Sequence, residues 1–158
     1  MSTPGSEPIT AEGLRALEAE LHRLETEERL TMSERIKAAR ELGDLKENAE
    51  YHIAKDDQAH LETKIKRLRE RLLAARVVEA DEGGEAFGFG RTAEVLDEKT
   101  GRVHTWTIVG ATEADISAGR LASESPVAQA LMGRGPGETV EVQTPGGTRT
   151  YVIQRLVT

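Results

Sequence analysis

Two carboxylates three residues apart, Asp44 and Glu47, are the residues of this sequence whose types and spacing could do chemistry. They lie in the run ELGDLKENAEY, residues 41–51. Carboxylate oxygens suit Mg²⁺, but this ion needs about six oxygens in octahedral array, more than two side chains supply. The pair could instead complete the shell of a Mg²⁺ ion that another protein's carboxylates and a phosphate also hold. In such a setting a second metal activates water for in-line attack on a phosphodiester.

The same spacing also fits a structural role. An Asp-x-x-Glu run at a helix start is a capping box, in which Asp44 accepts backbone N–H bonds and Glu47 reaches back to the cap. Once that helix begins, residues three apart share one face. The two roles are compatible, because a capped carboxylate keeps an oxygen lone pair for a metal.

Long helices are expected on both sides of this pair. From Leu14 to Asp81 the chain has one glycine, Gly43, and no proline, whereas glycine and proline are frequent after Asp81. Two apolar rows follow helical spacing: Leu14, Leu17, Leu21 and Leu24, then Ala54, Leu61, Ile65, Leu68, Leu72 and Ala75. A short turn near Gly43 favours an antiparallel coiled-coil hairpin within one chain. At about 1.5 Å per residue, the acidic pair would lie at the far end of a rod roughly 45 Å long.

The first apolar row is interrupted halfway along the rod. Its next two positions hold Glu28 and Thr31, and the apolar stripe resumes at Met32, Ile36 and Ala39. The heptad register therefore shifts, and we expect the coiled coil to loosen at this level.

The second half of the chain predicts strands and one helix. Residues 91–109 and 138–157 alternate apolar and polar side chains around central turns, which is typical of β-hairpins. Between them, Ser125 is placed to cap a helix that has Pro126 at its first position, and Gly133 can end it. We therefore predict an α+β protein whose second domain packs a helix across a small antiparallel sheet.

These patterns divide the chain into four parts. We expect a flexible N-terminus at residues 1–9, the hairpin with its acidic tip near 41–51 at residues 10–80, a linker at 81–86, and the second domain at 87–158.

Composition narrows the class of protein. The 158 residues carry a net charge of −7, and neither half is basic, which argues against a generic nucleic-acid binder. The chain has no cysteine, and its four histidines are scattered, so no zinc site is expected. No apolar run reaches the roughly 20 residues of a membrane span, and no secretory signal is evident. We expect a cytoplasmic protein that makes no contact with a membrane.

The tip sequence resembles that of a known family. Residues 41–52, together with the segments 121–133 (LASESPVAQALMG) and 144–147 (TPGG), closely resemble bacterial Gre-type transcript cleavage factors. The resemblance covers about residues 9–157 in order. It implies an N-terminal antiparallel coiled coil and a C-terminal domain similar to FKBP-type prolyl isomerases. It also implies that the second domain docks on RNA polymerase while the coiled coil enters the polymerase's secondary channel.

The resemblance further implies roles for individual residues. Asp44 and Glu47 match the acidic pair that helps to hold a Mg²⁺ ion shared with RNA polymerase, whose own centre then cuts the 3′ end of backtracked RNA. Lys55 matches a basic position expected to contact that RNA, although a solvated helix lysine is an equal alternative. Ser125 and Pro126 fall in the expected docking segment, where a cap and a first-turn proline are the structural alternative.

Three other functions remain open from the sequence. A channel-binding regulator that inhibits polymerase without stimulating cleavage would have no need of Asp44 and Glu47. A prolyl isomerase would need an aromatic-lined pocket, for which the second domain offers only Phe87, Phe89, Trp106 and Tyr151. A dimerising coiled coil would pair two chains, whereas the cleavage factor is expected to be a monomer without turnover of its own.

Overall fold

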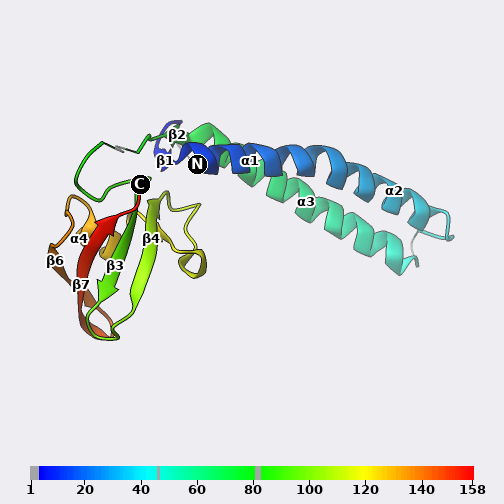
Figure 1. Ribbon diagram of the computed structural model, residues 1–158. Coiled ribbons are helices and arrows are strands. Elements are labelled where there is room, and N and C mark those ends of the chain that lie inside the picture. Colours follow the sequence, from blue (N-terminus) through cyan, green and yellow to red (C-terminus); the bar gives the residue numbers. More distant parts are fainter. Residues whose placement is uncertain (1–3, 46, 81–82) are drawn as a thin grey trace. The chain divides into compact units, whose positions relative to one another are not determined.

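The computed structural model describes residues 4–45, 47–80 and 83–158 (Figure 1). The chain divides into two compact units, the first containing Leu14–Ala75 and the second containing Glu7–Gly13 and Arg76–Thr158. Each unit has its own cluster of buried apolar side chains. The division after Ala75 falls slightly before the expected end of the hairpin, and residues 81–82 of the expected linker lie outside the described residues.

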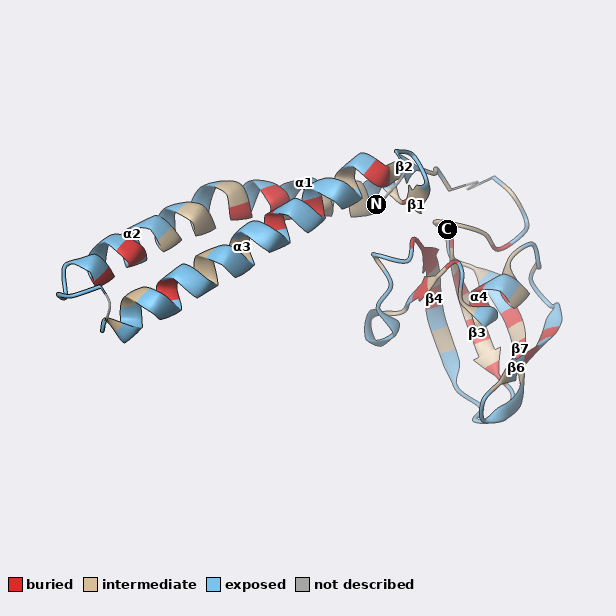
Figure 2. Cartoon of the chain, turned by 180° about the vertical axis from the view of Figure 1, so that it is seen from behind, coloured by how far each residue is buried: buried red, intermediate tan, exposed pale blue. Residues whose placement is uncertain are grey.

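The first unit is a helical hairpin. Helix α1 (Ala11–Arg23), a π-helix (Leu24–Glu28) and helix α2 (Arg29–Arg40) form one arm, and helix α3 (Ala49–Ala74) returns beside it (Figure 1). The buried side chains lie where the two arms face each other (Figure 2). They come from both apolar rows: Leu21, Leu24, Ile65 and Leu68, with Leu17, Leu61 and Leu72 around them. Each arm therefore covers the apolar row of the other, as predicted, and these rows are not left for a second chain.

The interruption of the first apolar row is a π-helix. The N–H of Arg29 donates to the carbonyl of Leu24, five residues back, and the hydroxyl of Thr26 donates to the carbonyl of His22 at 2.7 Å. A π turn accommodates one extra residue, so the apolar row resumes one position late, with Ile36 buried. Leu24 at the start of the π-helix is 2% exposed, and the next buried side chain of this arm is Ile36, so the packing of the interrupted stretch between them stays a prediction.

Ion pairs on the surface of the hairpin link its two arms. They are Glu25–Arg69 at 2.5 Å, Arg35–Asp57 at 2.7 Å, Arg29–Glu62 at 2.9 Å and Glu20–Lys64 at 3.8 Å. Their side chains are largely exposed, so each pair contributes little to stability. In two pairs a base of α3 balances an acid of the first arm, and in the other two a base of the first arm balances an acid of α3.

The second unit is built on a five-stranded sheet with the order β5-β4-β3-β7-β6. The strands are β3 (Thr92–Asp97), β4 (Val103–Val109), β5 (Arg120–Ala122), β6 (Thr139–Thr144) and β7 (Gly147–Leu156). Helix α4 (Pro126–Leu131) adds Ala128 and Leu131 to the core of the sheet. That core contains Phe87, Val95, Trp106, Ile108, Tyr151 and Ile153 among others. Both predicted β-hairpins and the predicted helix are confirmed.

The sheet is mixed rather than wholly antiparallel, which corrects the prediction. Strand β5 pairs in parallel with β4, with Ile108 opposite Leu121. A 3₁₀-helix (Ile116–Ala118) precedes β5, and Gly119 between them has φ 77°, in the left-handed region. A Cβ at Gly119 would lie 2.5 Å from the carbonyl oxygen of Thr105, so this connection depends on a glycine.

Part of the expected flexible N-terminus is a strand. Strand β1 (Glu7–Ile9) pairs with β2 (Ala75–Val77), and residues 1–3 lie outside the described residues. One more backbone hydrogen bond, from the N–H of Val78 to the carbonyl of Ile9 at 2.9 Å, extends the pairing of this segment beyond the two strands. Thr10 then caps α1, its hydroxyl accepting from the N–H of Gly13 at 3.0 Å.

A buried carboxylate lies at the end of β3. Asp97 is 3% exposed, accepts from the N–H of Lys99 at 2.9 Å and pairs with Arg149 at 2.7 Å. Burial by itself raises the pKa of the Asp97 carboxyl. The backbone of Lys99 and Thr100 and the guanidinium of Arg149 favour the charged form more strongly, so that the pKa is lowered.

A lowered pKa makes the stability contribution of Asp97 depend on pH. The stabilisation by Asp97 is complete above the pKa of an aspartate in the unfolded chain, about 3.9. It is lost as the pH falls through the lower pKa that Asp97 has in the folded protein. We expect Asp97→Asn to lower the free energy of unfolding by about 1–3 kcal/mol at neutral pH, and by less below about pH 3. Urea unfolding at both pH values measures this, with exposed Glu141→Gln as control. An effect equally large in acid would contradict the assignment.

Candidate functional site

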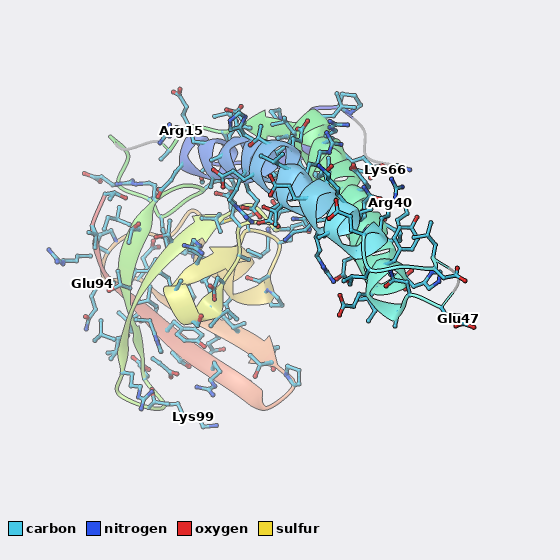
Figure 3. All side chains as sticks on the ribbon, turned by 90° about the vertical axis from the view of Figure 1, so that its right-hand side faces the viewer. Arg15, Arg40, Glu47, Lys66, Glu94 and Lys99 are labelled. Atoms are coloured by element: carbon cyan, nitrogen blue, oxygen red, sulfur yellow. The ribbon has the colours of Figure 1, made fainter. Side chains whose placement is uncertain are left out.

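The acidic pair lies on the loop that joins the two arms of the hairpin, residues 41–48. Gly43 has φ 131°, in the left-handed region, which allows the chain to turn after α2. Asp44 and Glu47 are both exposed on this loop, and Figure 3 shows Glu47 at its outer end. Lys46, between them, lies outside the described residues. The loop therefore presents both carboxylates at the end of the hairpin, as the sequence predicted.

The predicted capping box is wrong. Helix α3 begins at Ala49, and its cap is Asn48, whose side-chain oxygen accepts from the N–H of Tyr51 at 3.0 Å. Asp44 and Glu47 both precede this cap, so they do not share a helix face. Asparagine caps helices about as well as aspartate, and here its amide also donates to the carbonyl of Ala39 at 2.5 Å. An aspartate could not make this second bond.

Asn48 and Tyr51 connect the two arms at the tip. Asn48 reaches the end of α2 through Ala39, and the guanidinium of Arg40 lies 5.8 Å from the centre of the Tyr51 ring. This distance is within the range of a cation–π contact. Tyr51 therefore packs between the end of α2 and the start of α3. Asn48 and Arg40 were not predicted, although an asparagine directly before Ala-Glu-Tyr is itself a cap signal.

We expect Asn48→Ala to destabilise the hairpin by about 1–2 kcal/mol, because it removes a helix cap together with the bond to Ala39. Thermal unfolding followed by far-ultraviolet circular dichroism measures the change. Asn48→Asp is the matched control: it keeps the cap acceptor, loses the amide donor and should recover most of the loss. An aspartate variant as unstable as the alanine variant would show that the cap contributes nothing.

The tip does not carry a complete metal site. Among the described residues, no group of three or more His, Asp or Glu side chains is arranged to hold a metal ion. Glu47 makes no hydrogen bond or ion pair with another described residue, so its oxygens face solvent. Two carboxylates are hard oxygen ligands of the kind that Mg²⁺ takes, but water or another molecule must supply the other oxygens. The tip can therefore complete a metal shell but not provide one.

Lys55 lies on the exposed side of α3, a short distance from the tip. Its ammonium group donates to the side chain of Gln58 at 3.1 Å. Of the two aspartates that follow it, Asp57 is paired with Arg35 at 2.7 Å, whereas Asp56 is exposed. The negative charge near Lys55 is therefore smaller than the two neighbouring aspartates suggest, because one of them is paired with an arginine.

Ser125 and Pro126 have the structural role that was predicted as the alternative to docking. Ser125 caps α4, accepting from the N–H of Ala128 at 3.2 Å, and Pro126 is the first helical residue. Pro126 is exposed and Ser125 is half-buried. They belong to the second unit, whereas the acidic loop belongs to the first.

The aromatic residues that a prolyl isomerase would need belong to the core. Phe87, Trp106 and Tyr151 are 1%, 8% and 7% exposed and pack in the core of the sheet. In this arrangement Phe87 and Trp106 present almost no surface to a proline side chain, whereas Tyr151 also borders a cavity. No helix in the described ranges combines the length and apolar character needed to cross a membrane.

Comparison with known proteins identifies the family. Residues 7–77 match the family described as "Transcription elongation factor, N-terminal", and residues 82–156 match "Transcription elongation factor, GreA/GreB, C-term". The chain is 46% identical over 147 residues to "Transcription elongation factor GreA" of Acidiphilium cryptum, covering 92% of this chain and 94% of that protein.

Two further proteins extend the comparison. The chain is 43% identical over 150 residues to the protein of the same name from Phenylobacterium zucineum, with 94% and 96% covered. A solved structure, "Structure of the transcription factor Gfh1", is 25% identical, covers 100% of both chains and has a TM-score of 0.43. With both halves matched by the two family descriptions, the chain belongs to the GreA/GreB family of transcription elongation factors.

Proposed function

We propose that this protein enters the secondary channel of bacterial RNA polymerase and stimulates the polymerase's own cleavage of backtracked RNA. Arrested complexes would thereby be rescued in the cytoplasm. The observation that carries the proposal is the loop at the end of the hairpin, which presents Asp44 and Glu47 to solvent within the segment that resembles the family's tip. The proposed partners are the polymerase and the 3′ end of its RNA, and the protein acts as a monomer.

Each part of the chain has a distinct task in this proposal. Asp44 and Glu47 supply carboxylate oxygens to a Mg²⁺ ion that polymerase residues also hold. When bound, this ion supplies an activated water for attack on the phosphodiester. Lys55, exposed on α3, is placed to contact the phosphates of the extruded RNA. The second unit docks on the polymerase through the surface around Ser125 and Pro126.

The protein has no turnover of its own under this proposal. A bare acidic loop repels a phosphate backbone, and the chain provides too few ligands to hold Mg²⁺ tightly. The carboxylates can therefore act as metal ligands only where another protein already supplies ligands to the same ion. That condition makes the protein an accessory factor rather than an enzyme.

The test is a backtracked elongation complex from the cognate polymerase, carrying 5′-labelled RNA and Mg²⁺. We expect the wild-type protein to shorten the RNA from its 3′ end rapidly, whereas the factor without polymerase leaves the same RNA intact. Tight binding without shortening would instead assign the protein to channel-binding inhibitors. Absence of binding would overturn the proposal.

A further inference from the structure

A second candidate site lies in the sheet unit. A cavity of about 410 Å³ lies at the end of the sheet that carries the β3–β4 and β6–β7 turns (Figure 1). Its walls include Arg102, His104, Arg149 and Tyr151. Cavities of roughly 300–1,000 Å³ suit small molecules. Two guanidinium groups in one cavity are notable in a chain with a net charge of −7.

The one acid in the wall of the cavity is already neutralised. Asp97 accepts from the N–H of Lys99 through one carboxylate oxygen and from Arg149 through the other. It is 3% exposed, and its two oxygens are turned to these donors rather than to a ligand. Its effect is to hold the guanidinium of Arg149 in place. That guanidinium has five N–H donors, of which the bond to Asp97 uses one.

The other arginine is not engaged. Arg102 is exposed, and its guanidinium makes no hydrogen bond or ion pair with any residue in the described ranges. Its backbone alone is engaged: the N–H donates to the hydroxyl of Thr100 at 3.3 Å, and the carbonyl accepts from the N–H of Asp97 at 2.8 Å. Arg102 can therefore turn its planar donor fork toward a ligand in the cavity without breaking a contact.

Hydroxyl groups add to these donors. Burial, together with the nearby carboxylate of Asp97, raises the pKa of Tyr151, so its hydroxyl stays protonated. Thr100 also lines the cavity, and its hydroxyl oxygen, which accepts from Arg102, still carries a proton to donate. Thr144 is different, because its hydroxyl already donates to the carbonyl of Gly147 at 2.7 Å. The free N–H and O–H donors of the cavity outnumber the hydrogen bonds that one carboxylate can accept. A phosphate monoester offers three strong acceptor oxygens and can therefore use more of these donors.

We propose that this cavity binds the phosphate group of a small phosphorylated molecule, held between the guanidinium groups of Arg102 and Arg149. The hydroxyls of Tyr151 and Thr100 complete the set of donors. The remaining volume accommodates the rest of the molecule. This site is independent of the acidic loop and of the proposed action on polymerase.

The single tryptophan of the chain provides a specific probe. Trp106 stacks on His104, with ring centres 4.7 Å apart and planes 7° apart, and meets Tyr151 edge-on at 5.5 Å. Both partners line the cavity. Full-length protein is titrated with inorganic phosphate, phenyl phosphate and acetate at constant ionic strength. The indole N–H resonance and the fluorescence of Trp106 are followed.

We expect saturable changes with phosphate compounds and weaker binding of acetate. Arg102→Gln should weaken binding about tenfold, whereas Arg134→Gln, an equally exposed arginine of the same unit, should leave it unchanged. Arg149→Lys keeps a charge beside Asp97 but loses the planar fork, so it too should weaken binding. Tighter binding of phenyl phosphate identifies a phosphorylated organic molecule as the ligand, and equal binding identifies the free ion.

The proposal is overturned by any of three results. The first is the absence of a saturable change at Trp106. The second is equal weakening by Arg102→Gln and Arg134→Gln, which would indicate general screening of charge. The third is acetate binding as tightly as the phosphate compounds.

Discussion

Asp44→Asn and Glu47→Gln are each expected to reduce stimulated RNA cleavage by about 100-fold, since each removes a charged oxygen ligand from the proposed shared metal. Each substitution preserves the size of the side chain and removes its negative charge. Both positions are exposed on the loop, so the hairpin itself should be unaffected. Rates of RNA shortening at saturating factor measure the loss. A higher Mg²⁺ requirement in the variants would locate the defect at the metal.

Glu41→Gln is the matched control for these two variants. Glu41 is exposed on the same loop and has the same charge, but it lies outside the pair. We expect it to stimulate cleavage at the wild-type rate. Competition with wild-type protein for polymerase shows whether the inactive variants still bind. Unchanged cleavage by Asp44→Asn and Glu47→Gln, or equal loss with Glu41→Gln, would contradict the role of the pair as metal ligands.

Ile65→Ala is expected to destabilise the hairpin by about 2–5 kcal/mol, the range for removing a buried aliphatic side chain. Ile65 is 1% exposed and packs with Leu21, Leu24 and Leu68. Because this cluster has only four buried members, few neighbours can close the resulting cavity. Far-ultraviolet circular dichroism reports on the hairpin, which contains most of the helix, whereas Trp106 fluorescence reports on the sheet unit.

Ile153→Ala is the reciprocal control. Ile153 is fully buried in the core of the sheet unit, together with Trp106. We expect this variant to shift the fluorescence transition and Ile65→Ala to shift the dichroism transition. Each unit has its own core, so the two transitions should separate. Coincident shifts in both variants would show instead that the units unfold together.

Much of the fold could be predicted because its patterns are local. The two leucine rows identify the hairpin, and alternation around Gly101 and Gly146 identifies both β-hairpins. Strand β5 could not be predicted, because three residues are too few to show alternation and a parallel partner is joined by a longer connection rather than by a tight turn. Strand β1 was missed for a similar reason, since its pairing with β2 joins residues far apart in the chain.

The position of the acidic pair was predicted, but the local geometry around it was not. The exposure of Asp44 and Glu47 at the end of the hairpin follows from the position of the turn. That Asn48 rather than Asp44 caps α3 does not follow from the position of the turn, because asparagine and aspartate both cap helices well. What distinguishes them is the carbonyl of Ala39 on the opposite arm, which only an amide can reach as a donor. That contact exists only once the hairpin has closed.

Because of the π-helix at Leu24–Glu28, the first arm contains one residue more than its interface with α3 requires. Deleting one residue there would return the segment to an ordinary α-helix, and Met32, Ile36 and Ala39 would then continue the heptad of Leu21 and Leu24. Such a deletion need not be matched by a compensating change in the facing helix. The π-helix is thus a place where this arm can lose a residue while Ile36 and Ala39 keep facing α3.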